Sequence, residues 1–81
     1  MRIARTTYID IEGLGDRIRT ARKLDKRTLK QIAKEAGLSE GHWHVIEKEQ
    51  GVIPEETLLR MQEVLQVNLG FQEEFDKLSK S

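Results

Sequence analysis

Residues 28–39 of this chain read TLKQIAKEAGLS, and this stretch decides the fold. Thr28 and Gln31 have the T-x-x-Q spacing of a capping box, so we expect a helix to begin directly after Thr28. Gly37 stands where a helix ends in a left-handed conformation, and Ser39 is a good N-cap for a second helix. The sequence therefore predicts two helices joined by a very short turn.

Helical periodicity continues on both sides of this pair. Before it, an apolar stripe with spacings of four, three and three predicts a helix. The stripe consists of Leu14, Ile18, Ala21 and Leu24. After the turn, Trp43 and Ile46 are the inward candidates of a helix over residues 39–49. Gly51 and Pro54 mark a loop and the start of a fourth helix, which has a clear apolar face.

The two ends of the chain have more open interpretations. Residues 6–11, TTYIDI, are rich in β-branched and aromatic side chains and favour a strand, paired with residues 67–71 or with a second copy. The alternative is a disordered arm that reaches DNA with Arg2 and Arg5. Residues 67–71 alternate as in a strand, whereas the aromatic and leucine spacing that follows suits a short helix.

Composition limits the classes of protein that fit. The chain has 81 residues, and a domain of this size has little room for a large substrate cavity. It contains no cysteine, which excludes a disulfide framework and thiolate metal ligands. No apolar run is long enough to span a bilayer, and the first residues are not followed by the apolar stretch of a signal peptide. We therefore expect a cytoplasmic protein that has no membrane partner.

The formal net charge is zero, but the charges are unevenly distributed. Residues 1–34 carry ten Lys and Arg against four Asp and Glu, and residues 35–81 carry four against ten. A basic half suits a polyanion such as DNA, while two differently charged solvated faces are the plainer reading. The basic residues concentrate around the start of the 28–39 segment, and they are Arg22, Lys23, Lys26, Arg27 and Lys30.

The order of these signals resembles the XRE family of Cro/cI-repressor-like helix-turn-helix proteins. The matching residues are Ile32, Ala33, Ala36, Gly37, Leu38 and Ser39, then Trp43, Ile46 and Glu47, then Thr57, Leu58 and Leu59. The resemblance covers residues 14–66 and implies an all-α fold, a compact four- to five-helix repressor-like domain, here with short terminal β-strands. The expected organisation is a strand or arm over residues 1–12, a DNA-binding domain over 13–66 and a dimerisation element over 67–81.

The resemblance also implies how DNA is bound, with the helix over residues 39–49 in the major groove and the preceding helix starting against the backbone. The residues expected at the DNA are Arg27, Thr28, Lys30, Ser39, Glu40, Gly41, His44, Val45 and Lys48. We expect few contacts to bases, because Leu29 stands where many family members have a glutamine that contacts phosphate and base. No Arg, Asn or Gln falls on the outward face of the reading helix.

The expected function is a transcriptional regulator that binds double-stranded DNA as a homodimer. The alternative is a helix-turn-helix scaffold used for protein–protein interaction, or an antitoxin-like or phage-type regulatory module with a protein partner. We expect that the protein is not an enzyme and binds no cofactor. No serine or histidine has an acid partner at a useful spacing, and no glycine-rich phosphate loop is present. His42 and His44 lie on different sides of a helix, which argues against a metal site.

Overall fold

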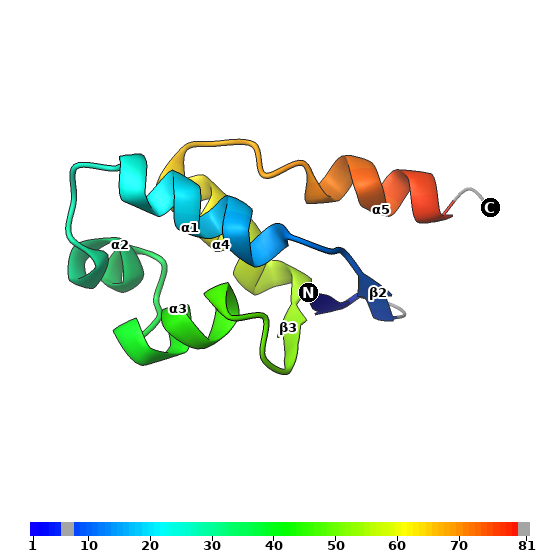
Figure 1. Cartoon of the computed structure of the whole chain (residues 1–81), viewed down its shortest axis with the longest axis horizontal. Coiled ribbons are helices and arrows are strands. Elements are labelled where there is room, and N and C mark those ends of the chain that lie inside the picture. Colours follow the sequence, from blue (N-terminus) through cyan, green and yellow to red (C-terminus); the bar gives the residue numbers. More distant parts are fainter. Residues whose placement is uncertain (6–7, 80–81) are drawn as a thin grey trace.

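The architecture is built around five helices and three short strands in the part of the chain that the computed structural model describes, residues 1–5 and 8–79 (Figure 1). In chain order the elements are β1 (Arg2–Ala4), β2 (Tyr8–Asp10), α1 (Leu14–Leu24), α2 (Leu29–Glu35), α3 (Glu40–Glu47), β3 (Val52–Pro54), α4 (Glu55–Leu65) and α5 (Phe71–Ser79).

The turn between α2 and α3 has the structure that its sequence predicts. The Thr28 hydroxyl oxygen accepts from the Gln31 N–H at 3.2 Å, which caps α2. Gly37 adopts a φ of +74°, and the Leu38 N–H donates to the Ala33 carbonyl at 2.8 Å, closing the end of α2. Four residues thus separate the two helices, and the short connection fixes their crossing.

The core lies between α1, α2, α3 and α4, with apolar side chains from each helix. Trp43 and Ile46 of α3 are fully buried, as the sequence predicts. The same core takes in Leu14, Ile18, Ile32, Ala33, Leu58, Met61 and Leu65 from the other three helices. Leu24 departs from the expected apolar stripe, because it is 81% exposed. It lies in the last turn of α1, where its side chain lines an open groove on the surface.

A small sheet corrects the expected all-α class: the fold is mixed, although largely helical. Strand β1 is central, with Ile3 opposite Ile9 of antiparallel β2 and opposite Ile53 of parallel β3. Strand β3 is not terminal and lies where a loop was predicted. Burial of Ile3 (0% exposed) and Ile53 (3% exposed) explains the pairing, because both side chains enter the core.

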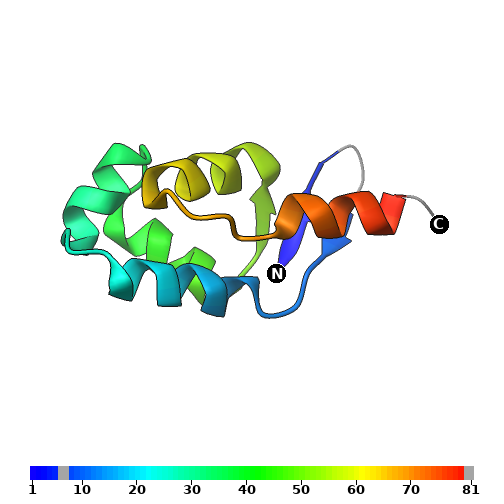
Figure 2. The same ribbon diagram turned by 90° about the horizontal axis from the view of Figure 1, so that it is seen from above.

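The chain ends also differ from one expectation. Residues 8–10 form a strand, as expected, in place of the alternative arm, but β2 pairs with β1 and not with residues 67–71. Residues 6 and 7 lie outside the described part. At the other end the helical alternative is confirmed, because α5 begins at Phe71, whose side chain is buried. Helix α5 lies toward the sheet end of the molecule, away from α2 and α3 (Figures 1 and 2).

The side chains of Phe75 and Leu78, which helped to predict α5, are not among those that the structure describes, and neither are residues 80 and 81. None of the helices within residues 1–5 and 8–79 combines the length and the apolar character needed to cross a membrane.

Candidate nucleic-acid interface

The outward face of α3 is open to solvent along its whole length. Glu40, Gly41, His44 and Lys48 are exposed, and Val45 is 40% exposed. Within the described part of the chain, none of these side chains takes part in a hydrogen bond or ion pair. A Cβ atom added at Gly41 would have no neighbour within 4 Å. The predicted base-facing residues therefore share one surface whose side chains form no hydrogen bond or ion pair with other described residues.

Two predicted site residues are helix caps. Thr28 and Ser39 are both exposed, and the Ser39 hydroxyl oxygen accepts from the His42 N–H at 3.1 Å, as the Thr28 oxygen does for α2. Each hydroxyl keeps its own proton, which can be donated to a further acceptor such as a phosphate oxygen. Structural and binding roles are therefore compatible at both positions.

The Arg27 side chain is engaged in hydrogen bonds within the protein. Its guanidinium donates to both Asp25 carboxylate oxygens, at 3.0 and 2.7 Å, to Glu35 at 2.7 Å and to the Val64 carbonyl at 2.7 Å. The hydrogen bonds from Arg27 hold the pKa of Asp25 at about 2, and the same contacts raise the pKa of Arg27. Lys30 is thus the predicted cation at the start of α2 that extends into solvent.

A buried carboxylate joins α1 to α3. Glu47 accepts from Arg22 through two nitrogens, at 2.5 and 3.0 Å, and from the Trp43 indole N–H at 2.5 Å. Its side chain is only 5% exposed, and its hydrogen bonds raise the pKa of Arg22. The sequence analysis did not identify this cluster. The spacing of four between Trp43 and Glu47 is the signal that would have suggested it.

Gly15 provides a second link between α1 and α3, and it too was missed. A Cβ atom at this position would lie 2.2 Å from the Glu47 carbonyl oxygen. Only glycine permits the two helices to approach so closely. The sequence shows a glycine within a helix and contains nothing to identify its distant neighbour. Together Gly15 and the Glu47 cluster set the position of α3 on the body of the protein.

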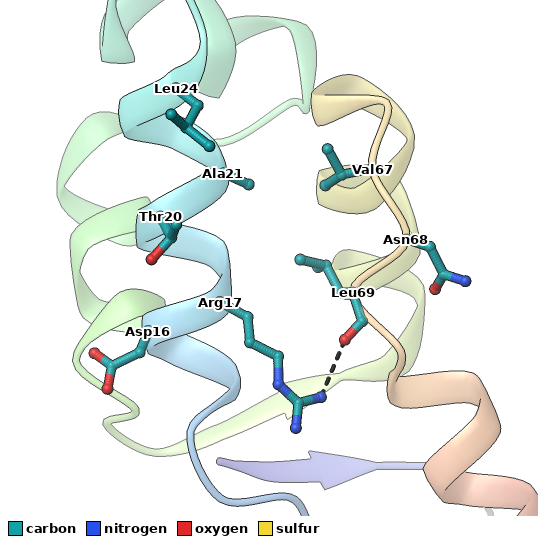
Figure 3. A pocket seen from close by; sticks show the side chains of 8 residues that line it. All are labelled: Asp16, Arg17, Thr20, Ala21, Leu24, Val67, Asn68 and Leu69. Carbon is teal, nitrogen blue, oxygen red and sulfur yellow. Dashed lines mark hydrogen bonds between the residues drawn. The ribbon is translucent and has the colours of Figure 1, made fainter.

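A shallow apolar groove of about 440 Å³ lies between α1 and the segment before α5 (Figure 3). Leu24, Ala21 and Val67 line it, and Leu24 and Val67 are among the exposed large hydrophobic residues. One end is bounded by Arg17, which donates to the Leu69 carbonyl at 3.1 Å. No residue of α3 lines the groove, and the segment before α5 lies on the other side of α1 from α3 (Figure 1), so the groove is separate from the candidate interface.

His42 and His44 are both exposed on α3. Among the described residues, no group of three or more His, Cys, Asp or Glu is placed to hold a metal ion.

No protein-family model matches the chain, and no curated protein or solved structure matches it.

Proposed function

We propose that this protein is a DNA-binding transcriptional regulator of the helix-turn-helix type, similar to the XRE family, that docks α3 in the major groove. The observation that carries the proposal is the combination of a short, hydrogen-bonded turn between α2 and α3 with an exposed α3 surface whose side chains form no hydrogen bond or ion pair with other described residues. An α-helix with one face open fits the major groove of B-DNA, and the short turn places α2 across the backbone.

Lysines supply the phosphate contacts in this arrangement. Lys30 on α2 and Lys48, which directly follows α3, are exposed, and neither forms a salt bridge with any described residue. Arg27 contributes indirectly, because its hydrogen bonds to Asp25 and to the Val64 carbonyl hold the segment before α2 against α4. Binding through such point charges is sensitive to ionic strength, since each neutralised phosphate releases counterions.

Base recognition is sparse. Glu40 can accept from a cytosine amino group, Val45 can touch a thymine methyl, and His44 can donate to a purine acceptor. None of them makes the two-bond contact that arginine makes with guanine. We therefore propose weak sequence discrimination and binding that depends on the backbone.

The test is an electrophoretic shift assay with random and selected duplexes over a range of salt concentrations. Binding should fall steeply as salt rises. The variant Lys30→Glu/Lys48→Glu should lose binding at least tenfold, whereas Lys77→Glu on α5 makes the same kind of charge change away from α3 and should bind almost normally. Absence of binding by the unaltered chain at low salt refutes the proposal.

We also propose that the protein acts as a homodimer, because two copies cover enough duplex for a stable complex and place their reading helices one helical turn apart. Sedimentation equilibrium tests this directly. A mass of one chain both free and on DNA would contradict it.

A protein-interaction module is the second candidate, favoured by the apolar groove beside Leu24. A partner that binds there after nuclease treatment should be lost in Leu24→Ser while the binding of duplex is unchanged. Loss of the partner on nuclease treatment alone would instead mean that DNA bridges the two proteins.

A further inference from the structure

A cleft of about 500 Å³ lies between α1 and the exposed edge of α3. Residues of both helices line it, and they are Asp16, Arg19, Arg22, His44, Glu47, Lys48 and Glu49. The cleft borders the α3 surface described above, since His44 and Lys48 belong to both. Whatever α3 docks against will therefore also meet the facing side of α1.

Three basic side chains and three carboxylates line this cleft, and ion pairs within the protein engage only some of them. Two of its carboxylates are occupied internally, because Glu47 binds Arg22 and Glu49 binds the amino group of Met1. Arg19 and Lys48, by contrast, form no ion pair with any residue that the structure describes. Asp16 is the one carboxylate of the cleft that no described cation balances.

Lys23 extends the same side of α1. It lies four residues after Arg19 in the helix, so their side chains leave the same face about 6 Å apart along the axis. Lys23 is exposed and has no salt bridge within residues 1–5 and 8–79. Phosphates on one strand of B-DNA follow one another at about 3.4 Å along the axis, so two such cations match phosphates about two steps apart.

We propose that Arg19 and Lys23 form a second row of phosphate contacts on α1, beside the helix that enters the groove. This inference rests on the proposed DNA binding. It assigns a backbone contact to Arg19, which the sequence analysis did not name, and pairs it with Lys23, which was counted there only among the basic residues near the start of the 28–39 segment. Arg19 and Lys23 supply the phosphate contacts that Arg22 and Arg27 do not make, because these two arginines are engaged in internal hydrogen bonds. A flexible lysine and an unpaired arginine can reach phosphate oxygens without breaking any contact of the fold.

The test compares salt dependence, which counts phosphate contacts directly. The logarithm of the binding constant falls with the logarithm of salt concentration by about 0.9 for each phosphate contact on B-DNA. The variant Arg19→Gln/Lys23→Gln should therefore lower the slope by about 1.8 and each single variant by about 0.9. Lys77→Gln should leave the slope unchanged, and Arg19→Lys/Lys23→Arg, which keeps both charges, should retain it.

The outcomes separate the two proposals. If the unaltered chain binds duplex with a steep slope and the double glutamine variant keeps that slope, the α1 row is wrong while DNA docking stands. If the unaltered chain does not bind duplex, both are wrong. The double glutamine and charge-conserving variants should have the same Tm, because neither side chain forms an ion pair within the described fold. If the charge-conserving variant is unfolded, these positions stabilise the fold and the proposal of phosphate contacts is wrong.

Discussion

Replacing Gly15 by alanine should destabilise the protein, although alanine is the better helix former. The added Cβ would lie 2.2 Å from the Glu47 carbonyl oxygen and 2.8 Å from the Glu49 Cγ atom. Ordinary contacts between heavy atoms lie at about 3.5 Å, so α3 would have to withdraw by about 1 Å. That movement disturbs the two hydrogen bonds that Glu47 accepts from Arg22 of α1.

The magnitude follows from two opposing effects. Forcing an extra methyl group into a packed contact costs about 1–3 kcal/mol, and the helix preference of alanine returns about 0.5–1 kcal/mol. We expect Gly15→Ala to lower the free energy of unfolding by about 1–2 kcal/mol. For a domain of this size, this corresponds to a fall of about 10 °C in Tm.

Gly41→Ala is the matched control. Gly41 is also a helical glycine, but a Cβ atom there has no neighbour within 4 Å. The same chemical change should therefore raise the free energy of unfolding by about 0.5–1 kcal/mol. Urea denaturation followed by the fluorescence of Trp43, the one tryptophan of the chain, measures both variants. Equal stabilities of the two variants, or an increase for Gly15→Ala, would refute the close approach of α1 and α3.

Three further substitutions test other parts of the fold. Ser39→Ala removes the cap of α3 and should lower stability by about 1 kcal/mol in urea; no loss would mean that water replaces the cap without cost. In Glu47→Gln the charge opposite the largely buried Arg22 is lost, and we expect about 2–3 kcal/mol of destabilisation, seen as a lower Tm. Asp25→Asn should destabilise the protein at neutral pH, because the pKa of Asp25 is held at about 2, below its ordinary value of 3.8. A carboxyl group whose pKa is lowered in the folded state stabilises the fold above its ordinary pKa, and this stabilisation is lost as pH falls through about 2. The difference in free energy of unfolding between Asp25→Asn and the unaltered chain should therefore disappear in acid. A difference that does not depend on pH would contradict this.

Local signals predicted the helices well. Hydroxyl caps, a turn glycine and apolar spacing all act within a few residues, so α1 to α4 appear where the sequence placed them. The exposed state of Leu24 was not predictable in the same way, because spacing identifies a helical face and does not show where its covering ends.

Contacts between distant segments account for what was missed. Ile3 pairs with Ile53, Arg27 donates to the Val64 carbonyl, and Gly15 meets the Glu47 backbone. In each case the single sequence shows a residue type without its partner. For the candidate interface, the sequence identified exposed residues of α3, but whether a cation is open to a ligand or engaged within the protein depends on the tertiary structure.

The parallel pairing of β1 with β3 has a consequence for how the molecule forms. During synthesis β1 is complete about fifty residues before β3, so the central strand of the sheet waits for its second neighbour. Helices close their contacts locally and quickly, whereas a pairing across so long a separation is slow. Helix α3, which precedes β3 in the chain, is therefore expected to reach its final position only when β1 and β3 have paired.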